Sequence, residues 1–134
     1  AARDVRERAW ARYSLFKVGA ALLTYRSQDI FSGTNVEAAD FDGTHAEESA
    51  ISAYVSSGTI LAPVMIVAVG AFVDAEGFAP IIPPCGKCRQ KIYEWVMRKG
   101  TAGQSDIDVI VADPSSGEPR LCSIRELLPL SFGL

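Results

Sequence analysis

The sequence predicts an α/β protein in which a mixed sheet of about five strands lies between helices on both faces, a three-layer α/β/α arrangement. Three observations predict this fold class. Amphipathic helical patterns alternate with short apolar runs typical of strands, and no linker or internal repeat interrupts the alternation. The 134 residues are also enough to bury a substantial core. We therefore expect residues 1–134 to form a single domain.

The first quarter of the chain is expected to form a helix followed by two paired strands. Apolar residues recur among charged ones over residues 3–13, a spacing typical of an amphipathic helix. Residues 16–24 are mainly apolar and predict a strand, and a polar turn at 26–28 leads into a second strand over 28–33. We expect these two strands to pair antiparallel.

A second helix is predicted over residues 45–57, where apolar residues recur at helical spacing. Thr44 is the expected N-cap of this helix, and Glu47, three residues later, is the expected capping-box partner. Gly58 follows the last residue of the pattern and predicts the end of the helix.

The rest of the chain predicts a strand, a long helix and another strand, then a turn, a short extended segment and a short helix. The first strand is a continuous apolar run, as in strands that are covered on both faces. Gly100 is expected to end the long helix and Pro129 the short one. In chain order, we expect these elements over residues 65–73, 85–99, 106–112, 114–117, 120–123 and 124–128.

The composition favours a soluble, cytoplasmic protein that acts on a small molecule. Apolar residues make up 49% of the chain, yet no apolar stretch approaches the roughly 20 residues needed to cross a bilayer. No signal-peptide pattern opens the sequence. The net charge of -3 provides no basic field that would attract nucleic acid. We therefore expect neither a membrane nor a nucleic acid as a partner.

Two short motifs contain the residues that are able to bind a metal ion or take part in catalysis. The only histidine, His45, precedes Glu47 by two residues, and a Pro-Cys-Gly-Lys-Cys run begins at Pro84. This combination is the signature of zinc-dependent nucleobase deaminases. His45, Cys85 and Cys88 supply three ligands and leave a fourth position on Zn2+ open for water, as in catalytic zinc sites. The positive end of the helix predicted to begin at Cys85 is expected to favour both thiolates.

Glu47 is the predicted catalytic acid and base. Zinc lowers the pKa of a bound water to near 7, and a carboxylate two residues from a ligand is expected to lie at the metal without binding it. Glu47 could then carry a proton to ring nitrogen N3 and assist the departure of ammonia. Two thiolates and a neutral imidazole would balance the charge of the zinc ion.

Each motif taken alone has another interpretation. His45 suits a surface or cap position at the start of a helix, and Glu47 suits a capping box. The paired cysteines suit half of a structural zinc site or a redox pair. A structural site requires a fourth cysteine or histidine ligand, and the remaining candidate, Cys122, has no second ligand at a paired spacing. A redox pair leaves the motif of His45 and Glu47 unexplained. The combination therefore favours catalytic zinc, and Cys122 is expected to be a buried apolar side chain.

The sequence resembles the short, homotetrameric type of cytidine deaminase over residues 13–133. Five motifs in the family's order and spacing carry the resemblance, at residues 13–22, 33–37, 45–47, 84–90 and 126–133. The resemblance implies the cytidine deaminase-like fold and a zinc-dependent hydrolysis of cytidine and deoxycytidine to uridine and deoxyuridine, as in pyrimidine salvage. It also implies a homotetramer whose substrates are free nucleosides.

The resemblance also implies roles for the substrate-binding residues. Asn35 and Glu37 match the pair that hydrogen-bonds the ribose hydroxyls, and Phe16 matches the aromatic residue that packs on the pyrimidine ring. The backbone amide of Ala46 is expected to meet the base carbonyl. Phe132 matches an aromatic residue that closes the pocket of a neighbouring subunit, which is the reason for expecting a tetramer.

The chain departs from the family pattern beside the metal motif. Many short members carry cysteine in place of His45 and arginine directly after the catalytic glutamate, where this chain has Glu48. Because a His-Cys-Cys centre is formally neutral, we expect no compensating cation, and we expect Glu48 to be a surface carboxylate at a helix start. Phe41 stands where an aromatic hydroxyl is common, and the stretch 97–105 is longer than usual.

Three other functions remain open from the sequence. Blasticidin S deaminase has similar zinc chemistry but lacks the pairing seen here as Asn35 and Glu37, which favours cytidine. A non-catalytic zinc-binding domain would have no need of Glu47. A polynucleotide deaminase shares the metal motifs, but the acidic balance of the chain favours a free nucleoside.

Overall fold

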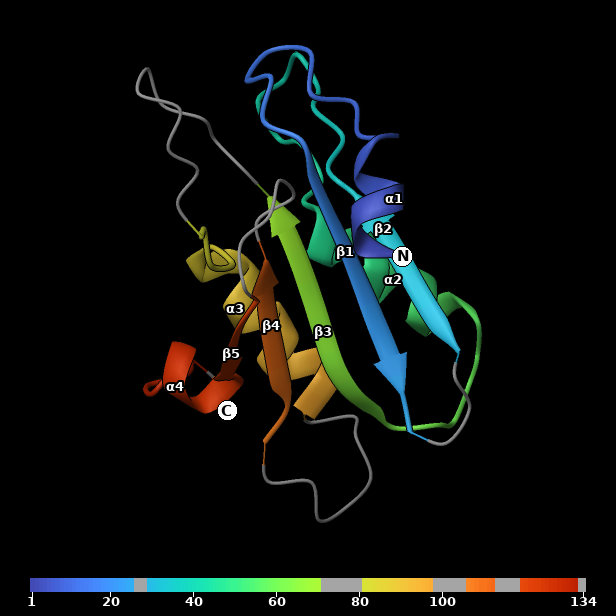
Figure 1. The fold of residues 1–134 in the computed structure, drawn as a ribbon, viewed down its shortest axis with the longest axis vertical. Helices are drawn as coiled ribbons and strands as arrows, with labels where there is room; N and C mark the ends of the chain where they lie inside the picture. The colour runs from blue at the N-terminus through green and yellow to red at the C-terminus, as the bar shows by residue number, and fades with distance from the viewer. Residues whose placement is uncertain (26–28, 71–80, 98–105, 113–118, 133–134) are drawn as a thin grey trace.

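The computed structural model describes residues 1–25, 29–70, 81–97, 106–112 and 119–132 (Figure 1). Helices and strands alternate along the chain, as the sequence predicts. In order, the elements are α1 (Ala2–Arg6), β1 (Val18–Thr24), β2 (Ile30–Thr34), α2 (Ala46–Ser56), β3 (Pro63–Gly70), α3 (Gly86–Ile92), the π-helical turn η1 (Tyr93–Met97), β4 (Asp108–Ala112), β5 (Arg120–Ser123) and α4 (Ile124–Leu127).

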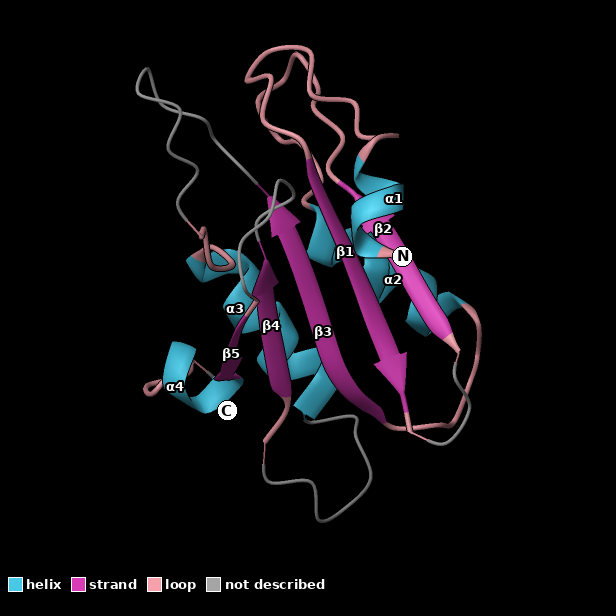
Figure 2. Ribbon diagram, in the orientation of Figure 1, coloured by secondary structure: helices cyan, strands magenta, loops and turns pink. Residues whose placement is uncertain are grey.

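A five-stranded sheet with the strand order β2-β1-β3-β4-β5 forms the centre of the fold (Figure 2). Strand β1 pairs antiparallel with both β2 and β3, β3 pairs parallel with β4, and β4 pairs antiparallel with β5. Ala21 of β1 lies opposite Ser32 of β2 on one side and Val67 of β3 on the other. The prediction of a mixed sheet of about five strands is confirmed, as is the antiparallel pairing of the first two strands.

Helices cover both faces of this sheet. In Figure 1, α1 lies in front of the sheet, whereas α2 and α3 lie behind it. The larger core cluster joins the sheet to α2, α3 and α4, and consists of Leu22, Ile51, Tyr54, Ile66, Ile92, Ile107, Val109, Val111 and Ile124. A smaller cluster of Ala2, Ala21, Val69 and Ala112 packs beneath α1. Within the described ranges, no helix has the length and apolar character that crossing a membrane requires.

The first helix is shorter than the sequence predicts. The prediction of a helix over 3–13 is wrong beyond Arg6, where α1 ends. The reason is a backbone pairing: the N–H of Trp10 donates to the carbonyl of Asn35, and the N–H of Glu37 donates to the carbonyl of Trp10. These bonds to a distant part of the chain replace the bonds that a continued helix would make.

The start of α2 also differs from the prediction. His45, and not Thr44, is the N-cap, because the backbone of Thr44 exchanges two hydrogen bonds with that of Val36. The capping-box partner is therefore Glu48 and not Glu47, and the N–H of His45 donates to Glu48 Oε2 at 2.8 Å. Gly58, with φ +69°, follows the C-cap as predicted.

The other predicted elements occur with modest changes of boundary. The long helix predicted from residue 85 divides into α3 and η1. Parts of several predictions lie outside the described residues: the turns at 26–28 and 114–117, the end of the strand predicted over 65–73, and positions 98–105.

Candidate active site

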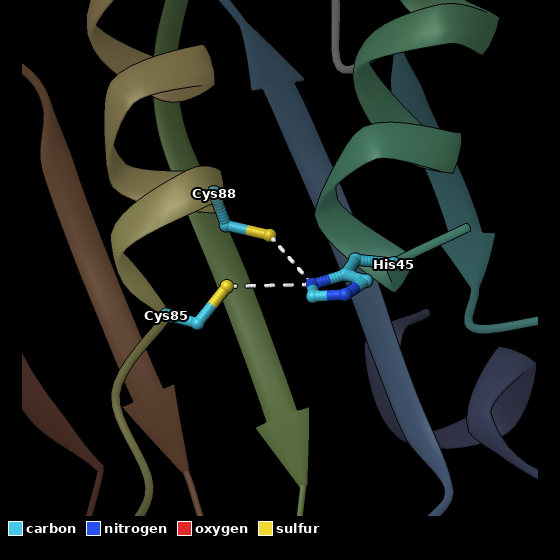
Figure 3. Close-up of side chains that lie close together, drawn as sticks. All are labelled: His45, Cys85 and Cys88. Atoms are coloured by element: carbon cyan, nitrogen blue, oxygen red, sulfur yellow. Dashed lines mark hydrogen bonds between the residues drawn. The ribbon is translucent and has the colours of Figure 1, made fainter. Parts of the chain in front are cut away.

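Three side chains from the starts of two helices converge on one point. His45 is the N-cap of α2, Cys85 is the N-cap of α3, and Cys88 lies in the first turn of α3. Figure 3 shows the imidazole of His45 directed toward both sulfur atoms. Its Nδ1 atom lies 3.4 Å from Sγ of Cys85 and 3.3 Å from Sγ of Cys88. The predicted ligands are therefore brought together.

This geometry fits a tetrahedral zinc ion. Zinc–sulfur and zinc–nitrogen bonds of about 2.3 and 2.05 Å at a tetrahedral angle separate the two donor atoms by about 3.6 Å, close to the distances between Nδ1 and the two sulfur atoms. The three donor atoms all lie within 4.8 Å of one another. Three protein ligands leave a fourth position for a reactant, which is the arrangement of catalytic zinc sites. In the described part of the chain, Cys122 lies outside this group and is only half-buried, contrary to the prediction of a buried side chain.

The two thiols differ in their surroundings. Cys85 is exposed, whereas Cys88 is completely buried. Burial, followed by the nearby Glu47 carboxylate and the sulfur of Cys85, raises the pKa of the Cys88 thiol well above its usual value. Without metal, desolvation of the charged form of Cys88 therefore outweighs the favourable effect of the helix end. A cation is needed to stabilise this thiolate.

Glu47 is buried beside the predicted ligands. The residue is 6% exposed, its carboxylate lies near the Cys88 thiol, and it lines the same cavity as His45. Because Glu48 occupies the capping-box position, the alternative interpretation of Glu47 as a capping carboxylate is wrong. Its carboxylate is left facing the metal centre.

A cavity of about 390 Å³ opens in front of these residues. Four of the five predicted substrate-binding residues line it, together with two of the three predicted metal ligands. Glu47, the predicted catalytic acid and base, also lines it. These lining residues are Phe16, Asn35, Glu37, Ala46, His45, Cys85 and Glu47. Phe41 also lines the cavity, although its side chain is fully exposed.

The side chains of Asn35 and Glu37 hold the segment that carries Phe16. Asn35 Oδ1 accepts the N–H of Val18, and its Nδ2 donates to the carbonyl of Phe16, both at 2.8 Å. The Glu37 carboxylate accepts the N–H groups of Tyr13 at 2.6 Å and Ser14 at 3.1 Å, and also the Ser14 hydroxyl. The hydrogen bond from the Ser14 hydroxyl is the main cause of the lowered pKa of Glu37. Burial acts in the opposite direction, and the two N–H groups lower the pKa further. Both side chains thus brace one wall of the cavity.

Phe132 lies outside the residues that line this cavity. Its side chain is 82% exposed. Its N–H donates to Gln90 Oε1 at 3.0 Å, and its carbonyl accepts from Gln90 Nε2. Phe132 is thus attached to α3 by its backbone while its ring faces away from the protein.

Glu48, Lys87 and Lys91 form a charge cluster that sequence reasoning missed. The residue Glu48 is only 7% exposed, so the prediction of a surface carboxylate is wrong. Its Oε1 lies 3.3 Å from Lys87 Nζ and pairs more closely with Lys91 Nζ. Both cations of the cluster come from α3, and both pair with Glu48. The i, i+4 spacing of the lysines on one helix face is the signal that could have revealed them.

Comparison with known proteins shows the family of this chain. Residues 1–103 match the cytidine and deoxycytidylate deaminase zinc-binding region. The chain belongs to the cytidine deaminase family. The family match and the nitrogen and sulfur donors together identify Zn2+ as its metal.

Similar members of the cytidine deaminase family span most of the chain. A cytidine deaminase from Halalkalibacterium halodurans is 33% identical over 130 residues, 96% of this chain and 86% of the relative. A probable cytidine deaminase from Dictyostelium discoideum is 37% identical over 133 residues, 98% and 79% of the two chains. The crystal structure of a cytidine deaminase from Burkholderia pseudomallei matches with a TM-score of 0.79 at 34% identity, and covers 98% of this chain and 93% of that one. The expected cytidine deaminase-like fold is confirmed.

Proposed function

We propose that the protein hydrolyses cytidine and deoxycytidine to uridine and deoxyuridine with release of ammonia. The observation that carries this function is that Glu47 and two of the metal donors, His45 and Cys85, line one cavity together with four of the residues matched to nucleoside binding. The cytidine deaminase names of its relatives support the same substrate. The protein is thus a zinc-dependent hydrolase of the carbon–nitrogen bond at C4 of the pyrimidine ring.

Glu47 performs the proton transfers of the reaction. Zinc held by His45, Cys85 and Cys88 supplies a Lewis acid that lowers the pKa of water to near neutrality. The Glu47 carboxylate takes one proton from the attacking water and delivers it to N3 of the base. It then takes the proton of the new hydroxyl at C4 and passes it to the amino group, so that the C4–N bond breaks, ammonia leaves and a carbonyl forms at C4. Burial of Glu47 in the cavity keeps bulk water from competing for these protons.

The remaining cavity residues position the nucleoside. Ala46 is the first residue of α2, where a backbone N–H has no intrahelical partner and is free to donate to the base carbonyl. Phe16 packs against the pyrimidine ring. Asn35 Nδ2 donates one N–H to the carbonyl of Phe16 and has a second N–H that donates to a ribose hydroxyl. The Glu37 carboxylate accepts a hydrogen bond from a ribose hydroxyl.

The enzyme acts as an assembly of several copies of this chain. Residues 1–134 form one catalytic domain that assembles as a homotetramer, in which Phe132 closes the cavity of a neighbouring subunit. The exposure of Phe132 outside its own cavity supports this arrangement. The enzyme serves pyrimidine salvage in the cytoplasm, and its net charge of -3 favours free nucleosides over nucleic acids as substrates.

A side-by-side assay tests the proposed reaction. Ammonia release is measured with cytidine, deoxycytidine and blasticidin S, and zinc per chain is determined on the same preparation. We expect turnover of the two nucleosides and one zinc ion per chain. Turnover of blasticidin S alone would contradict the proposal, as would a zinc-loaded protein without activity on any of the three.

A further inference from the structure

The carboxylate of Glu48 connects the two helices that carry the metal ligands. On the α2 side, Glu48 Oε2 accepts the backbone N–H of His45 at 2.8 Å, so it holds the residue that supplies the nitrogen ligand. On the α3 side, Oε1 is paired with Lys87 and Lys91. Lys87 lies between the two cysteine ligands in the sequence, and Lys91 lies one helical turn further on the same face.

The position of this carboxylate makes its partners necessary. Glu48 is 7% exposed, and a buried carboxylate is strongly destabilising unless other groups hydrogen-bond or pair with it. The lysine side chains are 46% and 42% exposed, so their ammonium groups keep contact with water while they reach the buried oxygen atom. The cluster is therefore an ion pair bridging two helices and not a surface pair within one helix.

We infer that Glu48, with Lys87 and Lys91, is a positioning device that sets the separation between His45 and the two cysteine ligands. This inference rests on the proposed metal centre but not on the reaction that it catalyses. Oε2 of Glu48 binds the backbone of His45. Its Oε1 binds two lysines of α3, the helix that starts at Cys85 and contains Cys88. Loss of the link lets the starts of α2 and α3 move relative to each other.

The expected consequence is weaker zinc binding. Groups that orient metal ligands typically change metal affinity by about 10–100-fold when they are replaced. Two ammonium groups against one carboxylate also leave one positive charge in surplus. Removal of Lys91 therefore changes both the helix spacing and the local charge, whereas Lys91→Arg keeps the charge and a donor that reaches the carboxylate.

Zinc affinity provides the test. The dissociation constant for Zn2+ alone is measured by competition with a chromophoric chelator for the parent protein, Glu48→Ala, Lys91→Met and Lys91→Arg. Glu7→Gln is the matched control, since Glu7 pairs with Arg6 and Lys17 on an exposed surface away from the ligands. We expect affinity to fall by about 10–100-fold in Glu48→Ala and Lys91→Met, and to stay near the parent value in Lys91→Arg and Glu7→Gln.

The partly exposed Lys91 keeps the test decisive if Glu48→Ala does not fold. Parent-like zinc affinity in folded Lys91→Met would overturn the inference, as would equal losses in Lys91→Met and Lys91→Arg. Thermal unfolding of the zinc-free proteins distinguishes general destabilisation from a specific effect on zinc binding. General destabilisation lowers the melting temperature without a selective loss of zinc affinity. Because no nucleoside is present, failure of the proposed deamination would leave this result unaffected.

Discussion

The side-chain amide of Gln90 forms two hydrogen bonds with the backbone of Phe132. Its oxygen accepts the N–H of Phe132, and its nitrogen donates to the carbonyl of the same residue. Gln90 lies in α3, two residues after the buried Cys88. The end of the described chain is therefore attached to the helix that starts at the metal centre, and the position of the Phe132 ring follows the position of that helix.

Replacement of Gln90 by leucine removes both bonds to Phe132. Because each hydrogen bond contributes about 1 kcal/mol, we expect amide exchange at Phe132 to be about 5–30-fold faster. We also expect the KM for cytidine to rise in the proposed tetramer while the zinc content stays the same. Hydrogen-exchange mass spectrometry and steady-state kinetics measure these effects. Glu94→Ala is the control, since it removes only the contact between Glu94 and Gln90 Nε2. Unchanged exchange at Phe132 in Gln90→Leu would contradict the structural finding.

Glu47→Gln separates metal binding from proton transfer. The amide preserves the shape of the side chain but cannot accept and return the proton, so we expect kcat to fall by about 10²–10⁴-fold or more. Zinc per chain and the far-ultraviolet circular dichroism of the whole protein should be unchanged, because Glu48 and not Glu47 caps α2. Loss of zinc, or full activity, in this variant would show that Glu47 has another role.

Zinc binding is expected to depend on pH through Cys88. Burial raises the pKa of the metal-free thiol, so near neutral pH the free protein holds a proton that metal binding must displace. Affinity should therefore increase as pH rises from about 6 to 8, since fewer protons compete with the metal. Calorimetry in buffers with different ionisation enthalpies measures the protons released. A proton release of zero over this range would exclude a protonated Cys88.

Glu48 is expected to make the stability of the zinc-free protein sensitive to acid. Burial raises the pKa of this group, but hydrogen bonds from Lys91, the His45 N–H and Lys87 outweigh that effect and lower it from 4.5 to about 2. A folded-state pKa below the unfolded value adds stability that is present above pH about 4.5 and is lost as pH falls toward 2. This shift corresponds to about 3 kcal/mol.

Urea unfolding of the zinc-free protein at a series of pH values measures this contribution. Glu48→Gln cannot ionise, so the difference in the free energy of unfolding between parent and variant should shrink as the pH is lowered from 5 toward 2. A constant difference over that range would show that ionisation of Glu48 does not stabilise the fold.

The sheet could be predicted from the sequence because its signals are local. The strands β1, β3 and β4 are apolar runs, and their boundaries need little information from elsewhere in the chain. The end of α1 could not be predicted in this way. Residues 7–13 continue a helical pattern, but Trp10 forms backbone bonds with a segment 25 or more residues later. Tertiary pairing overrides local preference at this point.

The metal ligands could be predicted because their spacing lies within two short motifs. The helix cap could not, since the choice between Thr44 and His45 depends on the pairing of Thr44 with Val36. The burial of Glu48 was missed for a similar reason. Its partner Lys91 lies 43 residues away in the sequence, and only the packing of α2 beside α3 brings the two charges together.

The bracing of the Phe16 segment by Asn35 and Glu37 determines when that part of the chain loses its conformational freedom. These side chains already hold residues 13–18 through hydrogen bonds in the free protein. The entropy of ordering this wall is therefore lost during folding and not during substrate binding, so that more of the contact free energy contributes to affinity. It also follows that substitution of either residue alters the shape of the empty cavity as well as its contacts with a sugar.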